Sequence, residues 1–258
     1  MSDEIISNPL ADLVICACAE AFEGDGEVLA SGIGLVQRIA ASLAMVKNPD
    51  LMMTDSEAYV VSEPVPLGKR NGYEPKRETW MGFSRIFDNV WSGARHALVG
   101  PSQIDQFGQA NISALGDYDK PKVQMLGVRG FPGNSISHAN SFFMPSHTKR
   151  SFVAGEVDTV CSIGYNPARM PKGHTLDDVD IRRIVTDLCV MDFEPSSKKM
   201  RIVSLHPGVS VETVLENTGF DLIVPDNLGQ TPEPTAEQLA TIKAIDPNNL
   251  RVNAVKPR

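Results

Sequence analysis

The sequence predicts an α/β fold, and two successive apolar strands joined by a helix support this prediction. Residues 27–31 are predicted to form a short buried strand, and a glycine turn at residues 32–34 leads into an Ala/Leu-rich stretch at residues 35–46. A second apolar run follows at residues 51–54, after a break at residues 48–50. Two strands joined by a helix form a right-handed parallel crossover, the unit from which α/β sheets are built.

Length and composition agree with this fold class. The chain has 258 residues, of which 42% are hydrophobic and 22% are charged, so disordered, collagen-like and coiled-coil proteins are excluded. A chain of this size buries a full core without disulfide or metal support. Because no repeat, low-complexity tract or linker divides it, we expect a single domain over residues 1–258.

Charge and cysteine usage narrow the classes of partner. The 32 acidic and 24 basic residues give a net charge of -8, which argues against nucleic acid. No apolar run approaches the roughly 20 residues that span a bilayer, and the chain starts with acidic rather than basic residues. We therefore expect neither export nor membrane insertion. A reducing cytoplasm fits the cysteines, which form no Cys-x-x-Cys pair: Cys16, Cys18, Cys161 and Cys189.

The N-terminal third begins with a helix and ends in an irregular segment. Asn8 is placed to cap a helix that has Pro9 in its first turn and runs to about Phe22. Residues 62–93 hold many prolines and glycines among charges and both tryptophans, which predicts a loop with one short helix. Loops of this length in a compact domain are typically functional or lie at an interface.

The middle of the chain predicts a hairpin and a glycine loop. Residues 97–104 read as extended, and Asp105 and Gly108 occupy the first and last positions of a type I turn. We expect residues 110–114 to return antiparallel to this strand. A further strand at residues 123–126 leads into the glycine loop at residues 127–134.

The C-terminal third adds strands and two helices. We expect a hairpin turn at residues 195–198, a helix at residues 211–217 closed by Thr218-Gly219, and a terminal helix to about Ala244. Thr235 and Gln238 form a capping box for that last helix. The predicted strands are residues 152–162, 183–186, 189–193, 202–205 and 220–224.

Several common active-site motifs are incomplete or absent. Gly32 and Gly34 resemble the start of a dinucleotide fingerprint, but Gln37 stands where the third glycine belongs, so a plain strand-to-helix turn is favoured. The five histidines form no pair at i, i+4, and we expect no metal site. A Gly-x-Ser-x-Gly nucleophile motif is also missing.

One candidate site follows the predicted strand at residues 51–54. Asp55 and Glu57 place carboxylates where a core strand ends, and open α/β sheets bind ligands outside the carboxyl ends of their strands. The alternative is structural, since Asp55 or Ser56 could cap a following helix. The residues alone leave both interpretations open.

The second candidate site is the glycine loop. Gly127, Gly130 and Gly133, followed by Asn134, expose backbone amides that can bind an oxyanion or a substrate, and Arg129 adds a permanent positive charge. A glycine-rich turn with a solvated arginine is the alternative. It accounts less well for several glycines around an embedded proline.

With these segments in place, the chain resembles the β subunit of class I coenzyme A transferases of the glutaconate type. The resemblance implies an open, mostly parallel sheet flanked by helices and an α subunit of related fold on a separate chain. It also implies an active site at the αβ interface, commonly in an α2β2 heterotetramer. Besides the glycine loop, the sequence blocks that carry this resemblance are Gly100, Gln103-Ile104-Asp105, Gly108, Leu115-Gly116-Asp117-Tyr118, Val185-Thr186-Asp187 and Leu215-Glu216-Asn217-Thr218-Gly219-Phe220-Asp221.

The chain departs from the transferases at their catalytic glutamate, which forms an acyl anhydride and then a thioester with coenzyme A. Asp55 holds that place, followed by Ser56 and Glu57. One methylene fewer retracts the carboxylate, and a misplacement of about 1 Å costs roughly 100-fold in a reaction that depends on alignment. In the glycine loop, Arg129, Phe131 and Pro132 replace small residues of the family pattern.

These departures resemble a branch of the family that cleaves steroid-derived rings as coenzyme A thioesters. That branch performs hydrolytic carbon–carbon cleavage of a cyclic β-keto thioester, with the general base on the α subunit. The resemblance implies no separate cofactor, because coenzyme A belongs to the substrate. Backbone amides and Arg129 would then stabilise an oxyanion.

Two other functions remain open at this stage. A coenzyme A transferase would use Asp55 or Glu57 as its nucleophile. A ligand-sensing domain of related architecture is the alternative without catalysis, although no helix-turn-helix segment precedes the α/β region.

Overall fold

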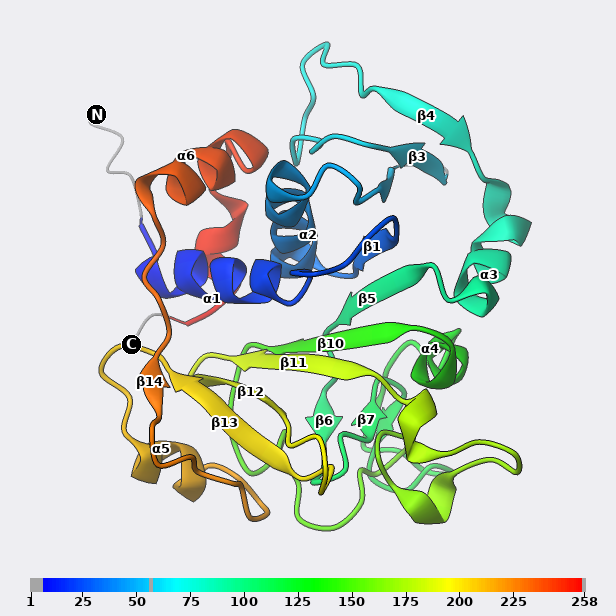
Figure 1. The fold of residues 1–258 in the computed structure, drawn as a ribbon, viewed down its shortest axis with the longest axis vertical. Helices are drawn as coiled ribbons and strands as arrows, with labels where there is room; N and C mark the ends of the chain where they lie inside the picture. Colours follow the sequence, from blue (N-terminus) through cyan, green and yellow to red (C-terminus); the bar gives the residue numbers. More distant parts are fainter. Residues whose placement is uncertain (1–6, 56–57, 257–258) are drawn as a thin grey trace.

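A mixed, mostly parallel sheet of seven strands forms the centre of the molecule. The computed structural model describes residues 7–55 and 58–256. The strand order is β1-β5-β10-β11-β12-β13-β14 (Figure 1). The first four strands are mutually parallel, β11, β12 and β13 pair antiparallel, and β14 is parallel to β13. The predicted α/β fold is confirmed.

The strands of the central sheet are β1 Leu29–Gly32, β5 Arg95–Val99, β10 Ala139–Met144, β11 Ile181–Thr186, β12 Cys189–Phe193, β13 Met200–Leu205 and β14 Gly229–Gln230. The strands of the three small antiparallel sheets are β2 Met53–Asp55, β3 Tyr59–Val61 and β4 Arg77–Trp80; β6 Gln103–Ile104 and β7 Ala110–Asn111; and β8 Ala114–Leu115 and β9 Val123–Gln124. The α-helices are α1 Pro9–Glu20, α2 Leu35–Lys47, α3 Gly82–Ser92, α4 Phe131–Ser137, α5 Val211–Glu216 and α6 Ala236–Ile245. Short 3-10 helices span Pro167–Arg169, Leu176–Asp178 and Leu250–Asn253.

The central sheet is buried on both faces, and side-chain alternation divides the core in two. On β5, Leu98 packs in the cluster that includes α1 and α2, whereas Ala97 and Val99 pack in the cluster on the opposite face. Phe143 and Phe142 of β10 are divided in the same way. Helices α1, α2 and α6 cover one face near β1, and α3 and α4 lie beside β5 and β10 on the other (Figure 1).

The predicted helix caps are present at both ends of the chain. The Asn8 side chain accepts the Ala11 N–H at 3.3 Å, and its amide donates to the carbonyl oxygens of Val252 at 2.9 Å and Val255 at 2.8 Å. The N-terminal cap therefore also holds the C-terminal segment. Thr235 and Gln238 form the reciprocal capping box, with bonds of 3.2 Å and 2.8 Å.

Two strand predictions in the later part of the chain were wrong, and one strand was not predicted. The strand that was not predicted is β10, which lies between β5 and β11 in the central sheet. Residues 152–162 bend, with only the end residues forming isolated bridges, and Gly155 turns the chain at a φ of +81°. Residues 220–224 contribute one bridge, from Ile223 to Arg201, and β14 takes the edge position instead.

The predicted strand at residues 51–54 also changes sheets partway. Met52 forms a parallel bridge with Leu29, beside β1, as the crossover required. The next residues form β2, which pairs antiparallel with β3 and leaves the central sheet. One interpretation expected a helix after Asp55; residues 56 and 57 lie outside the described residues, and where the description resumes the chain enters β3 at Tyr59.

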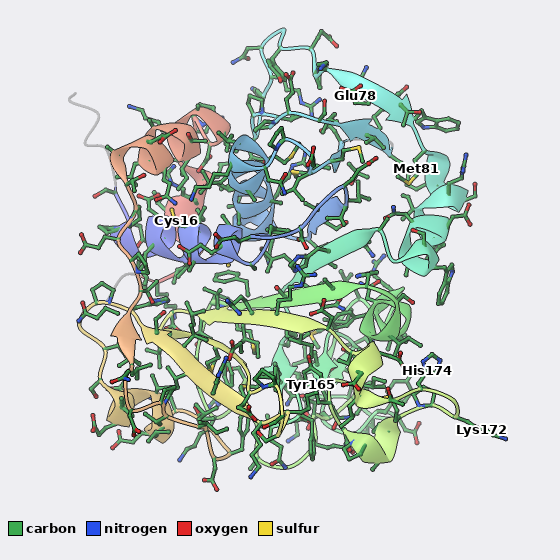
Figure 2. The ribbon with its side chains drawn as sticks, viewed as in Figure 1. Cys16, Glu78, Met81, Tyr165, Lys172 and His174 are labelled. Carbon is green, nitrogen blue, oxygen red and sulfur yellow. The ribbon has the colours of Figure 1, made fainter. Side chains whose placement is uncertain are left out.

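The irregular segment at residues 62–93 contains β4 and the 11-residue helix α3. Glu78 and Met81 lie on this segment, whereas Cys16 lies on α1 within the helical layer (Figure 2). All four cysteines are buried. Across the described ranges, no helix is both long and apolar enough to cross a membrane.

Candidate active site

A cavity of about 560 Å³ lies along one face of β5, from Arg95 to Gly100, and reaches Ile33 just after β1. Helices α3 and α4 and residues 125–130 close it, and apolar side chains form most of its lining, among them Ile33, Phe87, Val99, Leu126 and Phe131. Among the described residues, Arg95 and Arg129 are the charged members of the lining, which contains no carboxylate. Ile33 and Gly100 follow the carboxyl ends of β1 and β5, where open α/β sheets commonly bind ligands.

The glycine loop brings Arg129 to this cavity in an unusual backbone conformation. Gly127 has a φ of +84°, which glycine adopts freely, but Arg129 has a φ of +50°. A left-handed conformation costs a residue with a Cβ roughly 1–2 kcal/mol. Arg129 is exposed and makes no hydrogen bond or ion pair with another described residue. Its guanidinium is thus available to a ligand or to a partner chain.

The second half of the predicted glycine loop is helical. Gly130 caps α4, and both Gly133 and Asn134 lie within that helix. A Cβ at Gly133 would lie 3.1 Å from the Trp91 ring, so the glycine lets α4 pack closely on α3. Gly130 and Asn134 line the cavity, whereas Gly127 and Gly133 do not.

Asp55 lies at the end of β2 and outside the lining of this cavity. Its carboxylate is 2% exposed and is held by two arginines. Arg38 donates to Oδ1 at 3.2 Å, and Arg70 donates to Oδ2 at 3.0 Å and to Oδ1 at 2.5 Å. The structure therefore does not bring Asp55 and Arg129 together in one site. Glu57, with Ser56, lies outside the described residues.

Arg95 is the cavity residue that the sequence reading missed. Its Nε donates to Ser31 Oγ at 2.8 Å, and its Nη1 donates to Asn134 Oδ1 at 3.0 Å. Burial lowers the pKa of its guanidinium to about 10, which still leaves it charged at neutral pH. The available signal was the strand alternation, which points Arg95 to the same face as Ala97 and Val99.

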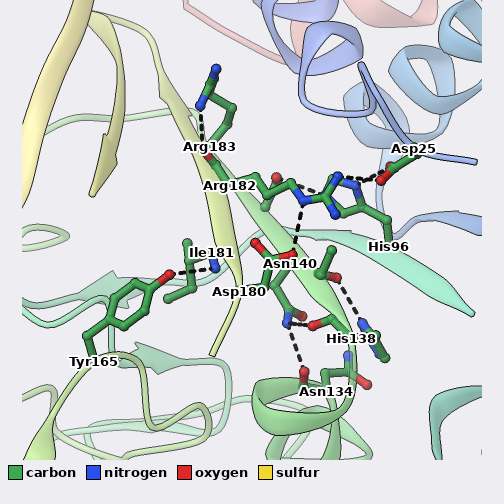
Figure 3. A network of polar contacts seen from close by, with 12 residues as sticks. Asp25, His96, Asn134, His138, Asn140, Tyr165, Asp180, Ile181, Arg182 and Arg183 are labelled. Carbon is green, nitrogen blue, oxygen red and sulfur yellow. Dashed lines mark hydrogen bonds and ion pairs between the residues drawn. The ribbon is translucent and has the colours of Figure 1, made fainter. Parts of the chain in front are cut away.

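His138 is a neutral neighbour of Arg95. Burial lowers its pKa to about 4, and the nearby Arg95 charge acts in the same direction. Its Nδ1 lies 2.8 Å from the Ala139 carbonyl oxygen, so Nδ1 donates and Nε2 accepts from Arg95 Nη1 at 3.5 Å. Asn140 donates to the carbonyl oxygens of Asn134 and His138, both at 2.8 Å, and holds these two residues in place (Figure 3).

The glycine turn between β1 and α2 leaves no room for a pyrophosphate. The Gln37 side chain folds back over the turn, and a Cβ at Gly34 would lie 2.3 Å from its Oε1. A Cβ at Gly100 would lie 2.8 Å from its Nε2. Gln37 thus fills the space between the two segments, which supports the strand-to-helix interpretation.

A buried series of hydrogen-bond contacts resembles a catalytic triad but is not accessible to a substrate. His96 Nδ1 lies 2.7 Å from Asp25, and His96 Nε2 lies 2.9 Å from Ser141 Oγ. Ser141 and His96 are both 0% exposed, so the hydroxyl cannot meet a ligand. Arg182 pairs with Asp25 and with Asp180, and the network joins β5 and β11 to the loop after α1 (Figure 3). Its role is structural.

No metal-binding group was found where the structure is described. Among residues 7–55 and 58–256, no three His, Cys, Asp or Glu side chains are placed to hold an ion.

Comparison with known proteins agrees with the sequence blocks. The coenzyme A transferase family description matches residues 16–217. The cholesterol ring-cleaving hydrolase IpdB subunit of Mycobacterium tuberculosis strain H37Rv is 40% identical over 95% of this chain and 98% of its own length. One of the subunits of glutaconate CoA-transferase from Acidaminococcus fermentans is 34% identical over 86% of this chain and 87% of its own.

A solved structure gives the same result at the level of the fold. The crystal structure of Rhodococcus jostii RHA1 IpdAB matches with a TM-score of 0.86 at 38% identity, covering 96% of this chain and 98% of that one. The family resemblance and the open, mostly parallel sheet that it implied are confirmed. The chain belongs to the coenzyme A transferase family.

Proposed function

We propose that this chain is the β subunit of a coenzyme A thioester hydrolase that opens a steroid-derived ring. The observation that carries the proposal is the state of Asp55, the carboxylate at the place of the transferase glutamate. Two arginines bind it in a nearly closed environment, away from the cavity that holds Arg129. The near full-length similarity to ring-cleaving hydrolase subunits supports the same function.

The proposed reaction is a hydrolytic retro-Claisen cleavage. A water molecule, deprotonated by a general base, adds to the ring ketone and forms a tetrahedral oxyanion. The bond between the former ketone carbon and the α-carbon then breaks, and its electron pair moves into the thioester enolate. Protonation of the α-carbon completes a product that carries a new carboxylate and retains its thioester. No separate cofactor is required, because coenzyme A arrives with the substrate.

In this reaction the β subunit supplies stabilisation of charge and the partner supplies the base. Arg129 and the Gly130 amide line the cavity, where they would stabilise the oxyanion or the enolate. The family resemblance assigns the general base to the α subunit. This scheme does not require Gly127, Gly133, Asp55 or Glu57; the participation that the sequence suggested for them stays a prediction.

An α subunit would cover the exposed apolar surface beside the cavity. The surface consists of Trp80, Phe83, Phe87, Trp91 and Leu126, each at least 55% exposed. Phe87 and Leu126 also line the cavity, so the surface and the candidate site are continuous. Large exposed apolar patches commonly mark protein interfaces. We propose an α2β2 heterotetramer in the cytoplasm with its active site at this interface.

Isotope labelling of the co-expressed αβ complex tests the reaction. We expect 2-oxocyclohexane-1-carboxyl-CoA in H2(18)O to yield a ring-opened dicarboxylic acid thioester with one 18O in its new carboxylate. A thiol reagent should detect no release of free coenzyme A, and the β chain alone should show no turnover. Release of thiol without ring opening would make the complex a thioesterase and refute the proposal.

The same complex separates the proposal from the transferase alternative. Incubation with the thioester and acetate, followed by borohydride treatment and peptide mass spectrometry, should leave Asp55 and Glu57 unmodified. A covalent adduct on either residue, together with formation of acetyl-CoA, would identify the complex as a transferase.

A further inference from the structure

Arg95 is held at the cavity with part of its hydrogen-bonding capacity unused. Ser31 accepts from Nε, and Asn134 and His138 accept from Nη1. Nη2 donates to no described group, and it is not among the buried polar atoms without a partner. The guanidinium is thus fixed along one edge, and its Nη2 end is left for a ligand in the cavity.

Arg95 has no carboxylate partner among the described residues, which is unusual in this molecule. Every other described arginine that is partly or fully buried forms an ion pair with an aspartate. These arginines are Arg38 and Arg70 with Asp55, Arg182 with Asp25, Arg183 and Arg201 with Asp192, and Arg251 with Asp12 and Asp246. A charge removed from water costs free energy unless it is paired, so the missing counter-charge at Arg95 points to an anionic ligand.

We propose that Arg95 binds, through Nη2, a carboxylate carried by the acyl part of the substrate, which makes Arg95 a positioning and specificity-determining residue. The proposal rests on the proposed function. It assigns separate roles to the two arginines of the cavity. Arg129, on the exposed loop, meets charge that develops during the reaction, and Arg95, on the sheet, meets a charge that the substrate already has.

The fixed geometry favours a ground-state anion over a transient one. Asn134 and Ser31 orient the guanidinium before any ligand arrives, and neutral His138 accepts from it without opposing its charge. A carboxylate that enters with the substrate compensates the Arg95 charge throughout binding and reaction. Arg95 should therefore act mainly on the Michaelis constant, since equal binding of ground and transition states leaves turnover unchanged.

A matched substrate pair tests the assignment in the αβ complex. The first substrate is 2-oxocyclohexane-1-carboxyl-CoA with a carboxymethyl substituent on the ring, and the second carries the carboxamide in its place. For the wild type we expect a kcat/KM roughly 100-fold higher with the carboxylate, mainly through KM. Arg95→Gln should remove this preference while kcat changes only a few-fold. Arg95→Lys should keep part of it, because it retains charge but not the planar fork.

Controls separate this role from general loss of structure. Arg150→Gln removes an exposed arginine outside the cavity and should leave the preference intact. Thermal unfolding and gel filtration check that each variant forms the complex. The wild-type preference needs no variant, so the test holds even if Arg95→Gln fails to assemble.

The outcomes are decisive in both directions. Equal kcat/KM for the two substrates in the wild type would overturn the assignment, as would an Arg95→Gln loss that is the same for both or confined to kcat. A separate calorimetric experiment measures the binding of the corresponding thioesters that lack the ring ketone. These thioesters cannot be cleaved. A wild-type preference in binding without any ring opening would support the Arg95 site and refute the proposed function.

Discussion

At position 129, an arginine holds a backbone conformation that glycine adopts at little cost. The energetic penalty of a left-handed residue is roughly 1–2 kcal/mol, and backbone strain of this kind is concentrated at functional sites. Because Arg129 has no partner among the described residues, the penalty is not offset by an observed contact. Selection for activity is the reason we favour for an arginine at this position.

Replacing Arg129 tests this interpretation. We expect Arg129→Ala and Arg129→Lys each to lower kcat for ring opening by roughly 100-fold, because the loss of one oxyanion donor costs about 3 kcal/mol and lysine cannot reproduce a bidentate contact. Arg129→Gly should lose the same activity and gain stability through relief of strain. Steady-state kinetics and thermal unfolding measure the two effects. Nearly full activity in the lysine and alanine variants would remove Arg129 from the site.

At the scale of elements, the β6–β7 hairpin depends on the buried carboxyl group of Asp105. The predicted turn is present, with the Gly108 N–H donating to the Asp105 carbonyl oxygen at 2.9 Å and Gly108 at a φ of +74°. The side chain accepts the N–H groups of Phe107 at 3.0 Å, Gln109 at 3.2 Å and Val157 at 3.3 Å. Burial outweighs these bonds and raises the pKa of Asp105 to about 7.

The raised pKa of Asp105 predicts a pH-dependent stability. Because the folded pKa exceeds the unfolded value of about 3.8, the native state retains its proton more strongly, and this contribution is lost as the pH rises from about 4 through 7. Between pH 5 and 8, the free energy of unfolding should fall by roughly 3 kcal/mol more in the wild type than in Asp105→Asn. Denaturation of the complex at both pH values measures this difference, with exposed Asp119→Asn as a control that keeps the wild-type slope. Parallel slopes in wild type and Asp105→Asn would contradict it.

For the molecule as a whole, the main feature is the apolar surface that this chain leaves exposed on α3. Phe83, Phe87 and Trp91 recur every four residues on α3, so they form one apolar stripe, while Val90 faces inward and is buried. The stripe is the outer side of a helix whose inner side closes the cavity through Ile86 and Val90. A partner that covers this stripe would also complete the cavity wall.

A charge on this stripe should prevent assembly without unfolding the chain. Phe83 is 71% exposed and lies outside the cavity lining, so Phe83→Glu should weaken at least about 100-fold the association with an α subunit, as expected for loss of an apolar interface anchor. Ser84→Glu adds the same charge to the neighbouring exposed position and should assemble normally. Analytical ultracentrifugation of the co-expressed chains measures both. Normal assembly of Phe83→Glu would place the interface elsewhere.

Local patterns in the sequence determined the elements whose signals are complete within a few residues. The Asn8 cap, the Thr235 capping box, the crossover through α2 and the turn from Asp105 to Gly108 depend on neighbouring residues, and each is present as expected. The blocks of family residues also identified the coenzyme A transferase family, because their order along the chain is itself the signal.

Only the tertiary structure decided the features that depend on distant partners. β10 contains Asn140 and Ser141, polar residues typical of loops, yet it is a central strand, in which the Asn140 amide donates to the carbonyl oxygens of Asn134 and His138 and the Ser141 hydroxyl contacts His96. Asp55 could be a nucleophile or a cap by sequence, and its partners Arg38 and Arg70 lie 17 and 15 residues away. Arg95 joined the site because strand pairing sets it beside Ser31, 64 residues earlier. A linear pattern carries no record of such contacts, since burial and pairing arise only when the sheet closes.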